Sequence, residues 1–215
     1  MNKLTVTLLA GLVLGTAGCG WHGIRGNGHL VTDQRPVGDF SEIDASGAVQ
    51  IEWRSGQPSL SITTDENVIS HVRSELNGKR LRIYSHGNIW PTDRIKVMVS
   101  SPNRIGAKLS GATRLTANQL SGAKFAIESS GASKVTLDGK VDELLADMTG
   151  ASKLEAGSLQ TKTAEISTTG AGHAEVAVSE SLKVAITGAG KVIYSGNPAT
   201  IEKNITGAGS IKHKE

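Results

Sequence analysis

One tripeptide, Ser/Thr-Gly-Ala, recurs through the second half of this 215-residue chain and restricts what the chain can fold into. Successive copies lie 20, 19, 20, 18 and 19 residues apart, and alanine directly follows the glycine in each. A fixed period of this size is typical of repeat architectures, in which equivalent units stack on one another. The glycines of the six copies are Gly111, Gly131, Gly150, Gly170, Gly188 and Gly207.

Aligning the copies on the glycine gives two further columns. The fourth residue after the glycine is always apolar: Leu115, Val135, Leu154, Ala174, Val192 and Ile211. The third residue is basic in five of the six copies, which defines a basic column: Arg114, Lys134, Lys153, His173 and Lys191. Polar and apolar residues alternate around both columns, and an alternation of period two predicts β-strands.

Each copy therefore predicts two short strands, joined by turns such as Asp138-Gly139 and Gly157-Ser158. Such a unit cannot bury its apolar side alone, so the copies are expected to stack about 4.8 Å apart. The sequence thus predicts an all-β, single-domain β-helix of about 19-residue coils, expected to be right-handed. The glycines would form its corners, the alanines would stack inward, and the Ser/Thr hydroxyls would bond along the stack. A β-sandwich is the competing architecture, but it does not require a constant corner tripeptide.

Residues 36–106 do not follow the regular spacing of the repeat. Ser46-Gly47-Ala48 predicts a first coil, and residues 64–76 carry the one helical pattern, with an N-cap-type start and apolar residues at positions 68, 69, 72 and 76. We expect wider first coils here, an N-terminal cap and a short helix. The β-helix domain would span 36–215.

The N-terminus reads as a targeting segment. Residues 1–18 hold one positive charge, an apolar run from Leu4 to Leu14 and small residues, followed by Cys19. The run is too short to span a bilayer but suits a signal peptide. It resembles the lipobox of bacterial lipoproteins, whose cysteine is lipidated, although Thr16 stands where leucine is usual. An ordinary secretory signal is the alternative. Gly20, in place of aspartate, implies the outer membrane, and residues 19–35 predict a flexible tether.

The chain also resembles the head GIN domain family of auto-transporter adhesins. The resemblance rests on the segments 40–49, 60–68 and 77–83 and on the Ser/Thr-Gly-Ala units, and it covers roughly residues 36–215. It implies a β-helical lipoprotein or secreted envelope protein, and adhesion by association. It supplies no catalytic residues.

Composition argues against most catalytic and metal chemistry. Cys19 is the only cysteine, which excludes a disulfide within the chain and a multi-cysteine zinc site. The histidines show no ligand spacing and no glycine-rich loop joins a strand to a helix, so we expect no metal and no cofactor. The acids are scattered; Glu155 and Glu175 alone share a column, at a spacing that would suit a retaining glycosidase. We interpret them as neutralising the basic column and expect no enzymatic activity.

The basic column is the one feature with a binding interpretation. Its side chains would form a line of positive charge that could bind an anionic glycan or lipopolysaccharide. The alternative is a solvated face on which neighbouring acids neutralise the basic side chains. The formal net charge is only +3 and aromatic residues are 3% of the chain, so nucleic acid is not expected as a partner.

Together these patterns predict a non-enzymatic, lipid-anchored envelope protein that presents a rigid surface for adhesion or ligand binding. A polysaccharide lyase or glycosidase on the same scaffold and a purely structural envelope protein are the alternatives. The repeat does not fix an oligomeric state.

Overall fold

The repeat folds into a β-solenoid, because alternate side chains of each long strand point inward and are buried. The computed structural model describes residues 23–214, is 73% strand and 2% helix, and has about five turns. The all-β solenoid prediction is confirmed. The repeat comprises β10 (Gly106–Gly111), β11 (Arg114–Gly131), β12 (Lys134–Gly150), β13 (Lys153–Gly170), β14 (His173–Gly188), β15 (Lys191–Ser195), β16 (Thr200–Gly207) and β17 (Ser210–His213).

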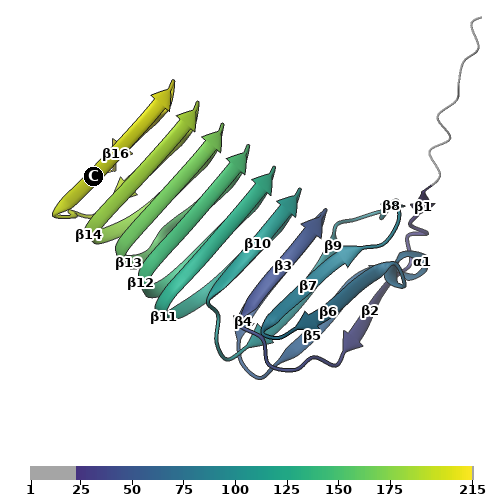
Figure 1. Cartoon of the computed structure of the whole chain (residues 1–215). Helices are drawn as coiled ribbons and strands as arrows, with labels where there is room; N and C mark the ends of the chain where they lie inside the picture. Colours follow the sequence, from purple (N-terminus) through teal and green to yellow (C-terminus); the bar gives the residue numbers. More distant parts are fainter. Residues whose placement is uncertain (1–22, 215) are drawn as a thin grey trace, which may run out of the picture.

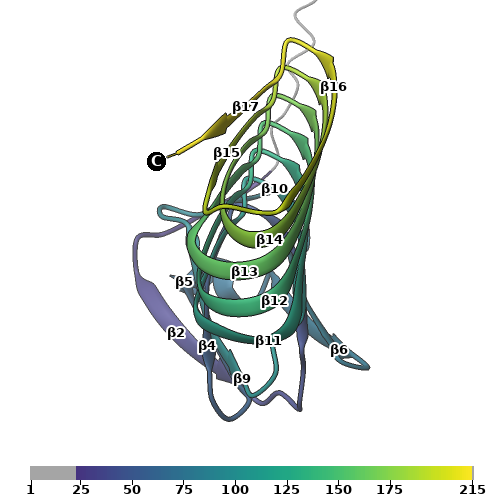
Figure 2. The same ribbon diagram turned by 90° about the vertical axis from the view of Figure 1, so that its left-hand side faces the viewer.

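Each long strand of the repeat covers two faces of the solenoid. The expected turns are bends within one continuous strand, where the pairing register shifts, as between Thr136 and Asp138. The first half of each strand lies on one face and the second half on the opposite face, and neighbouring coils pair in parallel (Figure 1). Viewed along the axis from the C-terminal end, the chain rises along β16, turns over the corner and descends along β17 toward the viewer (Figure 2). This sense of rotation is right-handed.

The interior consists of stacked apolar columns. One column consists of residues that succeed one another in register and are each at most 1% exposed: Leu115, Val135, Leu154, Ala174 and Val192. Such in-register burial supplies the free energy that a single coil could not gain alone. At the wider N-terminal end an aromatic group fills the interior: the Trp53 ring centroid lies 6.0 Å from that of Phe40 and 6.1 Å from that of Phe125.

The N-terminal part completes both faces. Its elements are β1 (Ile24–Arg25), β2 (Leu30–Arg35), β3 (Glu42–Gly47), β4 (Val49–Ser55), β5 (Ser59–Asp65), α1 (Glu66–Ile69), β6 (Val72–Asn77), β7 (Arg80–Ser85), β8 (Ile89–Trp90) and β9 (Ile95–Ser101). In space β7 and β9 lie beyond β3 and β4, although they follow them in sequence. The antiparallel strands β2, β5 and β6 then end the two faces.

Arg104 secures the passage from β9 back into the repeat. It is 6% exposed, and its guanidinium donates hydrogen bonds to the carbonyl oxygens of Trp53 (3.1 Å), Asn118 (2.8 Å) and Gln119 (2.6 Å). Burial lowers the pKa of this guanidinium. Gln119 has a φ of 54°, a left-handed conformation that is rare for a residue other than glycine. The arginine therefore satisfies the carbonyls freed where the coil bends.

Two expectations for the N-terminal part are corrected. The helix is one turn, Glu66–Ile69, and residues 72–77 form strand β6, because Val72 packs inward beside β7. Residues 24–35 are not a flexible tether: they form β1 and β2, and β2 pairs antiparallel with β5 over its whole length. The ordered domain therefore begins before residue 36. The signal peptide, Cys19 and residues 20–22 lie outside the described residues.

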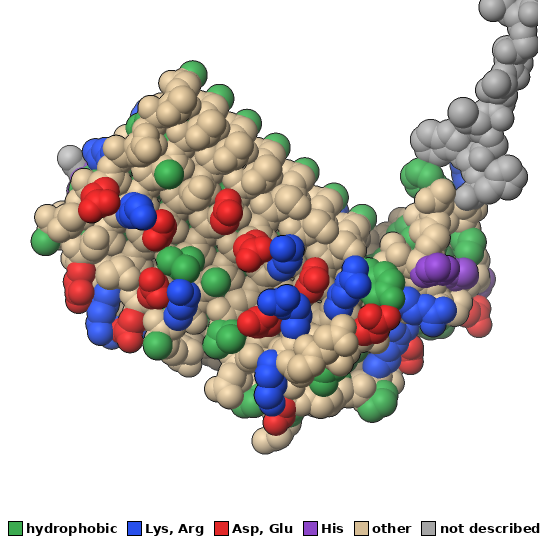
Figure 3. Space-filling view, viewed as in Figure 1, with side chains coloured by type: hydrophobic (Ala, Val, Ile, Leu, Met, Phe, Trp, Pro, Cys, Tyr) green, Lys and Arg blue, Asp and Glu red, His purple; other side chains and the backbone are tan. Residues whose placement is uncertain are grey.

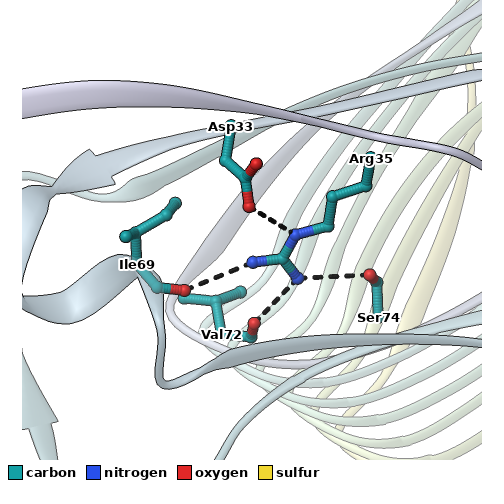
Figure 4. A network of polar contacts seen from close by, with 5 residues as sticks. All are labelled: Asp33, Arg35, Ile69, Val72 and Ser74. Carbon is teal, nitrogen blue, oxygen red and sulfur yellow. Dashed lines mark hydrogen bonds and ion pairs between the residues drawn. The ribbon is translucent and has the colours of Figure 1, made fainter.

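One arginine joins the two faces at the N-terminal end. Arg35, on β2, donates hydrogen bonds to Asp33 Oδ2 (2.8 Å), to the carbonyl oxygens of Val72 (2.8 Å) and Ile69 (3.2 Å), and to Ser74 Oγ (3.2 Å) (Figure 4). Because β2 belongs to one face and β6 to the other, this network closes the N-terminal opening of the solenoid.

Candidate binding surface

The predicted corner glycines stand in one row. Gly47, Gly111, Gly131, Gly150, Gly170, Gly188 and Gly207 are register neighbours through consecutive coils. Gly170 has a φ of +111°, and a β carbon there would lie 2.8 Å from the carbonyl oxygen of Gly150. The left-handed conformation and the close approach of the preceding coil both require glycine.

The alanines after these glycines do not stack inward as expected. Ala151 and Ala171 are exposed, and the inward position falls one residue later, at Ser152 and Gly172. The reason is the left-handed glycine, which reverses the chain so that the next side chain points outward. The Ser/Thr column before the glycine is also outward. The hydroxyls that do bond at the corner belong to the inward position, as where Thr113 Oγ1 donates to the carbonyl oxygen of Ser110 at 2.8 Å.

These outward residues form an uncharged strip along the corner, which we call the neutral ridge. Figure 3 shows it as the tan upper part of the molecule, with the alanine column as a line of green along its edge. The ridge comprises Ser110, Ala112, Ser130, Ala132, Thr149, Ala151, Thr169, Ala171, Thr187, Ala189, Thr206 and Ala208.

The basic column also stands in register, from Arg114 through Lys134, Lys153 and His173 to Lys191. Acids interrupt it. Glu155 accepts contacts from Lys153 Nζ at 2.7 Å and from Lys134 Nζ at 3.0 Å. Lys153 and Lys134 lower the pKa of Glu155 to about 2. Among the described residues no acid lies within ion-pair distance of Arg114, His173 or Lys191, so the column is neutralised at its centre and free at its ends.

The acidic pair considered for catalysis is occupied by lysines. Glu155 and Glu175 are register neighbours, but Glu175 contacts Lys214 Nζ at 2.6 Å while Glu155 binds its two lysines. Each of the two carboxylates therefore forms ion pairs with lysines. Within residues 23–214 no group of three or more His, Cys, Asp or Glu side chains is placed to hold a metal ion.

The opposite face carries a lattice of ion pairs between neighbouring coils. Lys108 binds Glu128 at 2.8 Å and Lys183 binds Glu165 at 2.8 Å, and in each pair the acid raises the pKa of the lysine. Figure 3 shows these charges as mixed blue and red over the lower part of the face. Pairs at a solvated surface contribute little stability, so this lattice mainly balances charge.

Sequence reasoning missed a shallow hollow on this charged face. The outward column that carries Glu42 holds only Gly106 and Ala126 on the next two coils, which leaves space above the sheet. Half-exposed Ile105 borders it, together with Lys108 and other charged side chains. Two successive small residues at outward positions are the signal that predicts such a hollow.

The family assignment follows from these repeats. The family described as "Putative auto-transporter adhesin, head GIN domain" matches residues 39–198. The chain belongs to this family. No curated protein has a sequence that matches the chain significantly.

Solved structures show the same fold. A putative adhesin from Bacteroides fragilis has 21% identity and a TM-score of 0.75, over 89% of this chain and 100% of that one. A putative adhesin from Parabacteroides merdae has 21% identity and a TM-score of 0.58, over 90% and 99%. A putative lipid binding protein from Parabacteroides distasonis has 22% identity and a TM-score of 0.59, over 89% and 99%. The family and the two adhesin neighbours are named for adhesion, not for an enzyme.

Proposed function

We propose that this protein is a non-enzymatic, lipid-anchored protein of the bacterial cell envelope, whose solenoid is a rigid surface for adhesion. The observation that carries the proposal is the register of outward columns, which repeats the same chemical groups about 4.8 Å apart along the stack. A backbone ladder fixes this spacing, so a repeating ligand would meet a preorganised row of contacts. The adhesin family supports the same function.

The ligand class that the charges favour is an anionic glycan or lipopolysaccharide. In the described part of the chain Arg114, His173 and Lys191 have no acidic partner. Anionic groups of a ligand could therefore pair with these three side chains, which Glu155 does not neutralise. The attraction should weaken as salt rises past the roughly 10 Å screening length of 0.1 M.

The test compares binding of heparin and lipopolysaccharide by the unacylated Cys19→Ser protein and two triple variants. Lys134→Glu/Lys153→Glu/Lys191→Glu reverses the basic column, and we expect at least a tenfold loss of affinity in low salt. Lys124→Glu/Lys162→Glu/Lys183→Glu makes the same change in net charge elsewhere and should bind far better than the first variant. Equal binding by all three proteins would mean that the basic column is only a solvated face and does not bind the ligand.

The anchor is tested separately. We propose that Cys19 is lipidated and holds the protein in the outer membrane, which Gly20 in place of aspartate supports. In residues 23–214 no helix has the length and apolar character that a membrane span requires. Cys19→Ser should release the protein into the soluble periplasmic fraction and abolish palmitate labelling. Unchanged fractionation and labelling would refute the lipoprotein assignment.

A further inference from the structure

The solenoid begins very close to the proposed lipid. Strand β1 starts at Ile24, five residues after Cys19, and five residues span at most about 18 Å when fully extended. Ile24 is fixed to the body of the domain: its N–H donates to the carbonyl oxygen of Asn88 at 2.9 Å, and β1 pairs in parallel with β8. Asn67 holds the same segment by donating from Nδ2 to the carbonyl oxygen of Arg25 at 2.7 Å. A lipid on Cys19 would therefore keep this end of the domain near the bilayer.

This end differs chemically from the two charged faces of the solenoid. We define the N-terminal tip as residues 23–30, 66–71 and 86–92. Arg25 and Glu66 are the only formally charged side chains in these ranges when histidine is neutral. The faces of the solenoid, by contrast, carry rows of ion pairs. A nearly uncharged surface loses little solvation free energy when it enters a layer of low dielectric.

The tip also exposes large apolar side chains. Leu30 is 52% exposed and Trp90 is 47% exposed. Tryptophan is enriched at membrane–water interfaces, where its ring is apolar and its N–H remains near polar groups. The tip includes Gly23, the first described residue, and Figure 3 shows green and purple side chains gathered at this end of the molecule.

We propose that the N-terminal tip rests on the lipid surface into which the acyl chains of Cys19 insert, with Leu30 and Trp90 in the headgroup layer. This inference rests on the lipid anchor of the proposed function. The acyl chains would hold the protein at the membrane, and the apolar tip would add a second contact that fixes its orientation. The solenoid then leads away from the membrane, and its last coil stands about seven coil spacings, or about 34 Å, from β7.

The experiment uses full-length lipidated protein reconstituted in phosphatidylcholine vesicles. The lipid consumes the thiol of Cys19, so an introduced cysteine is the one free thiol. A fluorophore is placed on Asn88→Cys at the tip or on Asn197→Cys near the C-terminal end, both exposed. Nitroxide lipids should quench the tip label at least threefold more strongly than the distant label. Equal quenching of both labels on protein that floats with the vesicles would overturn the docking and leave the anchor intact.

Side-chain variants identify the contact. Leu30→Ser/Trp90→Ser should at least halve quenching of the tip label without changing flotation. Met98→Ser removes another exposed apolar side chain, 44% exposed on β9, and should change neither. Unchanged quenching in the double variant would overturn the docking. Failure of the parent protein to float, with a reactive thiol at Cys19, would refute the anchor and the docking together.

Discussion

The Glu155 carboxylate lies 3.0 Å from the Nζ of Lys134, which projects from the preceding coil. Lys153, two residues before Glu155 on the same strand, contacts the other carboxylate oxygen at 2.7 Å. One acid thus holds two members of the basic column. The free positive charge of the column depends on this carboxylate as much as on the lysines themselves.

Loss of the Glu155 charge should make the solenoid less stable in acid. Lys153 and Lys134 lower the pKa of Glu155 to about 2 from 4.5, so its stabilisation is complete above about pH 4.5 and is lost as pH falls through 2. Because the ion pairs of Glu155 are partly solvated, we expect them to contribute about 1 kcal/mol to the free energy of unfolding. Denaturant unfolding between pH 6 and 2 should show a shallower pH dependence for Glu155→Gln than for wild type. Identical slopes would contradict the assignment.

Substitution at a corner glycine should be far more damaging than substitution beside it. Gly170→Val places a β carbon 2.8 Å from the Gly150 carbonyl oxygen on a backbone with φ +111°, and should destabilise by more than 2 kcal/mol. Ala171→Val adds the same side chain at an exposed position and should change stability by less than about 0.5 kcal/mol. Thermal unfolding monitored by circular dichroism measures both. Similar losses of stability in the two variants would mean that the corner position of Gly170 does not specifically require glycine.

Arg104 should be required for the bend of the first regular coil. Arg104→Met removes three hydrogen bonds to carbonyl oxygens and leaves those groups unsatisfied in the interior, so we expect a loss of roughly 2 to 4 kcal/mol. The control Arg114→Met replaces an exposed arginine without an ion pair and should be nearly neutral. Chemical denaturation gives the free energy of unfolding of both variants. An Arg104→Met protein as stable as wild type would contradict the role of Arg104 at the bend.

Lys203 should keep the C-terminal coil from associating. It occupies an inward column that holds Ala146, Ile166 and Val184 in the three preceding coils, each at most 3% exposed. A charge at the open end of a stacked sheet opposes pairing with another edge. Lys203→Ile should raise the apparent molar mass in sedimentation at high concentration.

The matched control for this prediction is Lys183→Ile, which makes the same substitution one coil earlier at an outward position. It should sediment as wild type. If both variants sediment as wild type, Lys203 has no protective role.

The sequence by itself determined the solenoid. A coil that cannot bury its own apolar residues must stack on equivalent coils, and the register of that stack appears in the sequence as a constant spacing between the Ser/Thr-Gly-Ala copies. It fixed Gly170 as a corner and Lys134, Lys153 and His173 as neighbours. The direction of Ala171 was decided by the left-handed turn at Gly170, which alternation alone does not predict. The position of β7 and β9 beyond β3 and β4 depends on contacts far apart in sequence. The same holds for Arg104, which bonds three backbone carbonyls, and for Arg35, which bonds two, because a carbonyl carries no signature in the sequence.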